Sequence, residues 1–83
     1  MKEVVFMSNL KKGQECKVVS IESNMRLKRR LLELGFIQGT IIKIEDVSPL
    51  KNSYLLQIRG YLIALRKSAV NSIKVEICEW IKI

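Results

Sequence analysis

Short stretches in which apolar and polar residues alternate recur along the chain, and alternation with a period of two indicates strands that bury one face. These stretches cover residues 15–21, 40–47, 54–58, 62–65 and 73–77. Gly13 precedes the first stretch, and glycine or proline lies between several of the others, at positions that include Gly39, Pro49 and Gly60. In the third stretch the inward row consists of Tyr54, Leu56 and Ile58. The pattern therefore predicts five short strands.

The segment before the second predicted strand has a helical period. Its leucines recur at i, i+4 and i+7 and mark a helix with one core-facing stripe. The stripe consists of Leu27, Leu31 and Leu34. Ser23 or Asn24 can cap the start of this helix, because either side chain accepts from the backbone N–H groups of a first turn. Gly35 stands where the helix end needs a positive φ, and Phe36 follows where an apolar contact back onto the helix is expected.

A second, single helical turn is predicted from Ser68 through Asn71, just before the last strand. The chain has 83 residues, of which 48% are apolar, so it suits one core and one domain over residues 1–83. Few strand edges remain if such a sheet closes on itself. We predict a mainly β fold, a small SH3-like β-barrel of about five strands with one inserted short α-helix and a short C-terminal helical turn. An open sheet packed against the helix is the alternative.

The composition offers little for catalysis. The chain contains no histidine, which removes the commonest general base and the commonest metal ligand together. Its two cysteines, Cys16 and Cys78, form no C-x-x-C pair, and we expect them to be reduced, small core residues. The neighbouring carboxylates Glu45 and Asp46 lie on an alternating strand, where charge that faces solvent is expected. We therefore expect no enzyme activity, no catalytic residue and no required cofactor.

The formal charge of +7 suggests an anionic partner such as nucleic acid, lipid headgroups or an acidic protein surface. Residues 26–30 hold four of the fifteen Lys and Arg side chains, interleaved with one leucine of the helical stripe. These cations form a candidate binding surface. A solvated helix face that serves only solubility is the alternative.

The sequence shows no segment for export or membrane insertion. Residues 1–9 have too short an apolar run for a signal peptide, and no stretch reaches the length of a transmembrane helix. We therefore expect a cytoplasmic protein.

The string Arg29-Arg30-Leu31-Leu32-Glu33-Leu34-Gly35-Phe36-Ile37-Gln38-Gly39 closely resembles a segment of the FeoA family, small proteins of bacterial ferrous iron uptake. Val47-Ser48-Pro49-Leu50 and residues 58–66 resemble two further segments of that family. The resemblance covers about residues 10–75 and leaves 76–83 as a C-terminal extension. It implies an SH3-like barrel in the cytoplasm that assists FeoB, the membrane transporter of ferrous iron with a cytosolic GTP-binding domain.

What the resemblance implies is a partner-binding surface, with the membrane reached only through the FeoB partner. The residues expected to contact the cytosolic region of FeoB are Arg26, Arg29, Arg30, Leu50, Lys51 and Arg66. Family members commonly have Pro-Leu-Gly-Asp-Pro in the hairpin loop, whereas this chain has Pro49-Leu50-Lys51-Asn52-Ser53. The resemblance also implies transition-metal association, but Cys16, Cys78 and surface carboxylates are the only conceivable ligands, so we expect at most weak association with Fe2+ or Zn2+. A homo-oligomer stays open, with a dimer contact expected if Trp80 is exposed.

Two other interpretations remain. The same barrel resembles the C-terminal SH3-like module of iron-dependent repressors of the DtxR type, although the DNA-reading domain of those proteins is missing here. Direct nucleic-acid binding suits the charge, but aromatic residues make up only 6% of the chain, too few for a stacking surface. We therefore expect no nucleic-acid partner.

Overall fold

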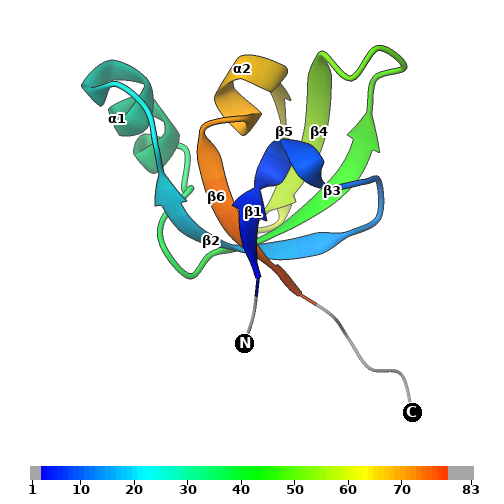
Figure 1. Ribbon diagram of the computed structural model, residues 1–83, viewed down its shortest axis with the longest axis horizontal. Helices are drawn as coiled ribbons and strands as arrows, with labels where there is room; N and C mark the ends of the chain where they lie inside the picture. The colour runs from blue at the N-terminus through cyan, green and yellow to red at the C-terminus, as the bar shows by residue number, and fades with distance from the viewer. Residues whose placement is uncertain (1–2, 79–83) are drawn as a thin grey trace.

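The structure is a computed structural model that describes residues 3–78, and within them it contains six strands, two α-helices and one 3-10 turn (Figure 1). The strands are β1 (Val4–Phe6), β2 (Glu15–Ile21), β3 (Ile41–Val47), β4 (Ser53–Ile58), β5 (Tyr61–Arg66) and β6 (Ile73–Cys78). The helical elements are η1 (Met7–Asn9), α1 (Met25–Glu33) and α2 (Lys67–Val70).

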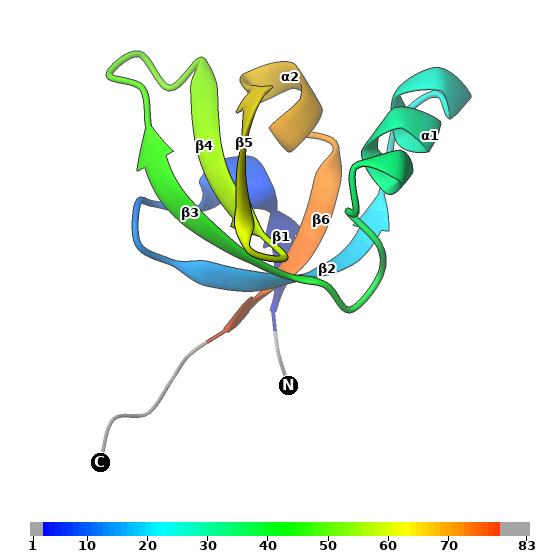
Figure 2. The ribbon, with the colours of Figure 1, turned by 180° about the vertical axis from the view of Figure 1, so that it is seen from behind.

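All six strands belong to one antiparallel sheet with the order β1-β6-β2-β3-β4-β5. The sheet curls around the core, and α2 packs against β4, β5 and η1 at the open side of the curl (Figure 2). Two register shifts, one in β2 between Val18 and Ser20 and one in β3 between Ile44 and Asp46, mark bulges that increase strand curvature. The mainly β, SH3-like fold class is confirmed, but within residues 3–78 no pairing between β1 and β5 closes the barrel.

The sequence pattern missed the N-terminal elements. β1 has only three residues, too few for alternation to show, yet it pairs with β6 through Val5 opposite Val75. η1 follows directly and places Met7 in the core with no exposed surface. The hydroxyl of Tyr54 donates to the carbonyl of Ser8 at 3.0 Å, which attaches this segment to β4.

The predicted start and end of α1 are both confirmed. Of the two predicted caps, Asn24 is the one used: its side-chain oxygen accepts from the N–H of Leu27 at 2.9 Å. At the other end, Phe36 N–H donates to Leu31 C=O at 3.0 Å while Gly35 has φ of 108°. A Cβ on Gly35 would lie 3.3 Å from Cδ1 of Ile58, so this glycine also lets the helix end approach β4.

The cap predicted for α2 is wrong. The helix begins at Lys67, one residue before Ser68, and its N-cap residue Arg66 makes no side-chain capping bond. The N–H of Lys67 donates instead to the carbonyl of Asn52 at 3.0 Å. Because a loop distant in sequence supplies that acceptor, no local cap residue is needed. The helix ends as predicted, with Asn71 as its C-cap.

The core is built mainly from the inward rows of the strands, with one residue of the helical stripe and with Met7, Leu10, Phe36 and Val70 from outside the strands. Tyr54, Leu56 and Ile58 are at most 1% exposed, as their alternation predicts. Leu31 is buried, while Leu27 and Leu34 are partly buried and pack against the core. The prediction about Trp80 lies outside the described residues.

Candidate partner-binding surface

The six predicted contact residues come from three elements that gather at one end of the molecule. Arg26, Arg29 and Arg30 lie on α1, Leu50 and Lys51 lie in the β3–β4 loop, and Arg66 ends β5. Figure 1 shows α1, α2 and this loop along the upper end, with α1 and the loop on opposite sides of α2. All six side chains are exposed. The residues therefore share an end of the molecule without forming one cluster.

A groove of about 460 Å³ between α1 and the β5–α2 segment brings two of them together. Arg30 lines it from the helix and Arg66 from the end of β5. Its apolar lining includes the whole helical stripe and one residue of β5: Leu27, Leu31, Leu34 and Leu65. We call this feature the arginine groove. The hydroxyl of Tyr61, at the start of β5, donates to the carbonyl of Leu34 and joins the strand to the C-terminal end of α1.

The other helical arginines differ in where they point. At about 100° per residue, Arg26 lies one turn before Arg30 on the same flank of α1, whereas Arg29 faces away from the leucine stripe. Lys28, which the prediction did not include, lines a second groove of about 240 Å³ between α1 and β2. The helical periodicity of the sequence separates Arg30 from Arg29, but only the fold shows which flank faces β5.

The cations of this end keep their charge unneutralised. Ion pairs link Lys12 to Asp46, Lys43 to Glu45 and Lys74 to Glu22. In the part of the chain that the structure describes, none of the five predicted cations forms such a pair. α1 itself contains four cations and a single acid, Glu33. This end therefore presents a positive field that attracts acidic groups.

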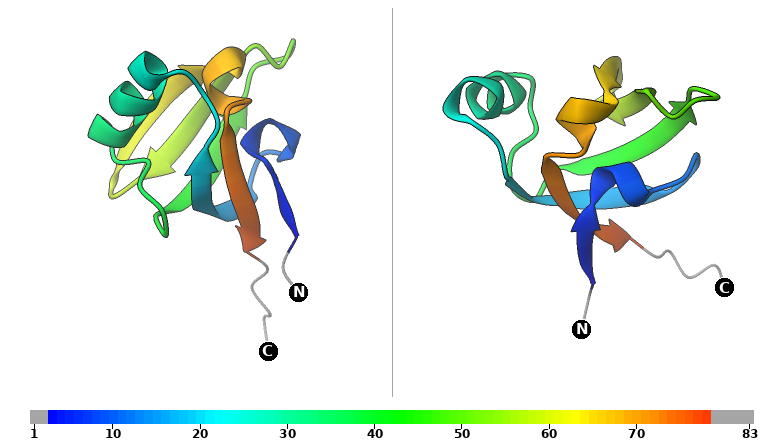
Figure 3. Two further views of the ribbon diagram at one scale, coloured as in Figure 1. Left: turned by 60° about the vertical axis from the view of Figure 1, so that its left-hand side comes forward. Right: turned by 45° about the horizontal axis from the view of Figure 1, so that its top comes forward.

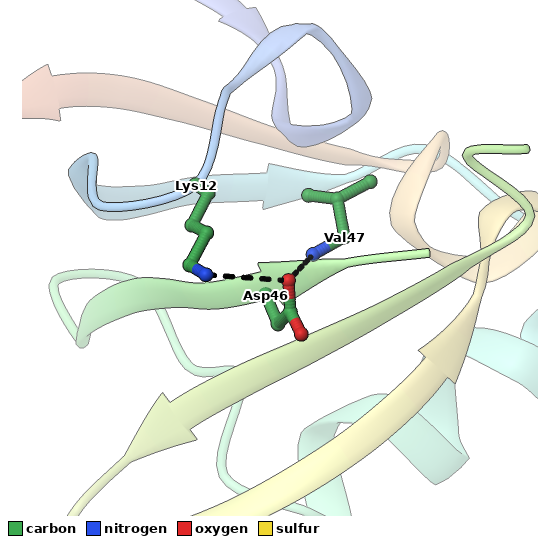
Figure 4. Close-up of polar contacts among 3 residues, drawn as sticks. All are labelled: Lys12, Asp46 and Val47. Carbon is green, nitrogen blue, oxygen red and sulfur yellow. Dashed lines mark hydrogen bonds and ion pairs between the residues drawn. The ribbon is translucent and has the colours of Figure 1, made fainter. Parts of the chain in front are cut away.

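Leu50 and Lys51 belong to a different surface. Leu50 is 83% exposed at the loop tip, and Lys51 lines a pocket of about 300 Å³ together with Lys11, Lys12 and Tyr54. We call this feature the lysine pocket. Nζ of Lys12 lies 3.8 Å from Oδ1 of Asp46, and the same carboxylate oxygen accepts from the N–H of Val47 at 2.9 Å (Figure 4).

Hydrogen bonds within the β3–β4 loop fix its shape. The hydroxyl of Ser48 accepts from the N–H groups of Asn52 and Ser53 at 3.1 and 3.0 Å, and donates to Oδ1 of Asn52 at 2.8 Å. Asn52 thus keeps a turn-forming side-chain bond at the position where the resemblance implies aspartate. Lys51, where the resemblance implies glycine, has φ of 57°, a left-handed conformation that costs free energy in a residue with a side chain.

The cysteines take no part in either surface. Cys16 is fully buried in β2, and burial raises the pKa of its thiol to about 12, with Cys78 and Glu15 adding to the shift. The thiol is therefore protonated and unreactive near neutral pH. Cys78 is only half-buried at the end of β6. Among residues 3–78, no group of three or more His, Cys, Asp or Glu side chains is arranged to hold a metal ion.

The fold defines a small SH3-like domain, one end of which is basic and partly apolar. The chain belongs to the FeoA domain family, because the family model of the FeoA domain matches residues 5–77. No helix within residues 3–78 is long and apolar enough to cross a membrane.

One curated relative is the Fe(2+) transport protein A/Fe(2+) transporter FeoB fusion protein of Porphyromonas gingivalis. It is 30% identical over 71 residues, which are 86% of this chain. The chain spans only 8% of the length of that fusion protein.

Solved structures of the same family have the same fold. A FeoA-like protein from Clostridium acetobutylicum is 28% identical with a TM-score of 0.87, covering 99% of this chain and 95% of that one. FeoA of Stenotrophomonas maltophilia, described as an SH3 domain protein and solved with zinc, is 28% identical with a TM-score of 0.76, covering 86% and 88%. A manganese-dependent transcriptional repressor has a TM-score of 0.84 at 13% identity, covering 94% and 44%, which shows a shared fold alone.

Proposed function

We propose that this protein is an accessory or regulatory component of bacterial ferrous iron uptake, which acts in the cytoplasm by binding the cytosolic region of a FeoB-type transporter. The observation that carries the proposal is the relative in which Fe(2+) transport protein A and FeoB are parts of one fusion protein. Fusion holds the two parts at a high effective concentration. A surface of this domain that contacts the transporter is therefore expected.

The unneutralised cations at one end of the molecule support this role. Arg26, Arg30 and Arg66 are exposed and, within the described residues, unpaired, so they are available to acidic groups of a partner. Arginine forms two parallel hydrogen bonds with a carboxylate, which gives such contacts direction as well as charge. We therefore assign these three arginines to the partner contact, with Arg29, Leu50 and Lys51 at its periphery.

In this proposal the protein acts by binding and catalyses nothing. The sequence contains no histidine, and the raised pKa of Cys16 keeps its thiol protonated near neutral pH. The protein also needs no cofactor, and it associates only weakly with Fe2+ or Zn2+. Calorimetric titration with either metal at 1 mM should give no saturable binding, and a site with micromolar affinity would contradict this part of the proposal.

The binding itself is tested with the cytosolic region of the transporter from the same genome, immobilised at 150 mM salt. The wild-type chain should bind it saturably, and Arg26→Glu with Arg30→Glu should weaken binding at least tenfold, since each charged contact is worth about 1.5–3 kcal/mol. Lys11→Glu with Lys12→Glu changes the net charge equally and is the matched control, expected to stay within threefold. The absence of saturable binding by the wild-type chain would overturn the proposal.

The same role has a cellular readout. Cells that lack this chain should take up ferrous iron at a different rate from wild-type cells. The difference should vanish when the transporter carries an inactive GTP-binding domain, because the effect then has no target. A difference of the same size in both backgrounds would place the protein outside this transporter's cycle.

A further inference from the structure

The arginine groove borders a strand with an open edge. Within the described residues β5 pairs with β4 alone, so one side of β5 has no neighbouring strand. The groove is lined by β5 on one side and by the leucine stripe of α1 on the other, and the views in Figure 3 place both elements beside α2. An open edge is costly to leave exposed, because it offers unpaired backbone groups to any extended chain.

The register identifies which backbone groups point outward. Arg59 and Gly60, with φ of 48° and 84°, form a two-residue hairpin turn of the kind in which the flanking residues exchange hydrogen bonds. The flanking pair here is Ile58 and Tyr61. Hydrogen-bonded pairs alternate along an antiparallel ladder. The outward N–H groups are therefore those of Leu62, Ala64 and Arg66. The outward C=O groups are those of Leu62 and Ala64, because the C=O of Arg66, the N-cap residue of α2, serves that helix.

We propose that the arginine groove binds an extended, acidic segment of a protein partner, which adds to β5 as a further strand and covers the leucine stripe of α1. The proposal rests on the proposed function in one respect only, that the natural segment belongs to the transporter. Its chemistry follows from the groove. Alternate side chains of an added strand face the apolar lining, and the intervening ones meet Arg66 or, across the groove, Arg30.

Charge favours such a segment over a second copy of this chain. An antiparallel β5–β5 pair centred on Ala64 would bring two copies together along the edge that ends in Arg66 and Lys67, and each copy has a net charge of +7. Like charges placed face to face disfavour that pairing. A segment with aspartate or glutamate at alternate positions neutralises the same arginines.

The probe is an acetylated, amidated eight-residue peptide in which leucine and glutamate alternate, titrated into the full chain at 150 mM salt. We expect saturable binding and at least tenfold slower amide exchange at Leu62 and Ala64, because strand addition uses these N–H groups. The same peptide N-methylated at its four central residues should bind at least tenfold more weakly. So should a peptide with lysine in place of glutamate.

Variants of the protein test the other side of the contact. Arg30→Glu with Arg66→Glu should weaken peptide binding at least tenfold, whereas Lys11→Glu with Lys12→Glu should stay within threefold. Ala64→Pro removes one outward N–H and should also weaken binding tenfold. If that variant fails to fold, the methylated peptide tests the same hydrogen bonds on the unaltered chain.

Several outcomes would overturn the inference. They are equal affinity of the methylated peptide, equal effect of the two charge reversals, and a β5-mediated dimer of the chain that excludes the peptide. Saturable binding of a single-stranded oligonucleotide at the same residues would likewise overturn it, because the ligand of the groove would then be nucleic acid and not a protein segment.

The failure of this inference and the failure of the proposed function can be told apart. If the peptide binds as predicted and the transporter's cytosolic region does not, the docking mode stands and the proposed function fails. If the cytosolic region binds without dependence on Arg30, Arg66 or the β5 edge, the function stands and this docking mode fails.

Discussion

The arginine groove and the lysine pocket are both basic, and both lie at the same end of the molecule, but they are built differently. The groove is lined by leucines of α1 and β5 that pack against the core, and its arginines are unpaired within the described residues. The pocket is lined largely by polar and charged residues of the segment before β2 and of the β3–β4 loop, and one of its lysines already has a carboxylate partner.

This difference shows why net charge alone does not locate a binding site. The lysines of the pocket are exposed and remain well hydrated, and exposed pairs such as Lys12 with Asp46 contribute little free energy. Arginines beside apolar surface and an open strand edge offer a partner three kinds of contact at once. Truncation of the buried Leu31 in the groove should destabilise the fold strongly, whereas changes in and beside the pocket should alter the free energy of unfolding by about 1 kcal/mol or less.

The largest effect is expected from Leu31→Ala in the lining of the groove. Leu31 is 1% exposed, and truncation of a buried leucine costs about 3 kcal/mol of unfolding free energy. Urea denaturation measures the loss, with Leu50→Ala as the control, because Leu50 is 83% exposed and its truncation should cost less than about 0.5 kcal/mol. Similar losses of unfolding free energy in both variants would show that the groove lining is no better packed than the tip of the β3–β4 loop.

Gly35→Ala should have the next largest effect, since it strains the junction that holds α1 beside β5. The new Cβ meets Ile58 Cδ1 at 3.3 Å at a φ of 108°, and strain plus contact should cost about 2 kcal/mol. Gly39→Ala is the matched control, because Gly39 has φ of 93° but open space around a Cβ. Thermal unfolding of both variants separates the packing cost from the backbone cost. A Gly39 variant as unstable as the Gly35 variant would show that packing adds nothing.

On the pocket side, Lys51→Gly should stabilise the protein modestly. It relieves the left-handed conformation of Lys51 at φ 57°, a gain of about 0.5–1 kcal/mol after the entropy cost of glycine. Lys51→Ala removes the same charge without relieving the backbone and should leave stability unchanged. Chemical denaturation of the two variants decides the matter, and equal stability of both would show that the loop is unstrained.

The smallest effect is expected from Lys12→Ala, below about 0.5 kcal/mol, because both side chains of its ion pair are exposed. Asp46→Ala should cost more, about 1 kcal/mol, since Asp46 also accepts from the N–H of Val47. Asp46→Asn keeps that acceptor and should behave like Lys12→Ala. Denaturation curves at 20 mM and 500 mM salt check the assignment, and a Lys12→Ala loss above 1 kcal/mol would contradict it.

Local patterns in the sequence were sufficient for much of the fold. The alternation of β2 and the inward row of β4 are visible in the sequence itself, and the capping residues before α1 and its end at Gly35 have signals within a few residues. Two elements without such a local signal were missed or misplaced. β1 exists because it pairs with β6, and α2 starts at Lys67 because Asn52 supplies its acceptor.

For the candidate surface, too, some features follow from the sequence and others only from the tertiary structure. The sequence by itself determined which residues are basic, which leucines share one side of α1, and that no histidine is available for catalysis. Only the tertiary structure decided that Arg30 and Arg66, 36 positions apart, line one groove beside an open strand edge, while Lys51 joins Lys11 and Lys12 in another. The physical reason is that periodicity reports the face of a single element, whereas a groove is formed by two elements whose approach is set by packing across the core.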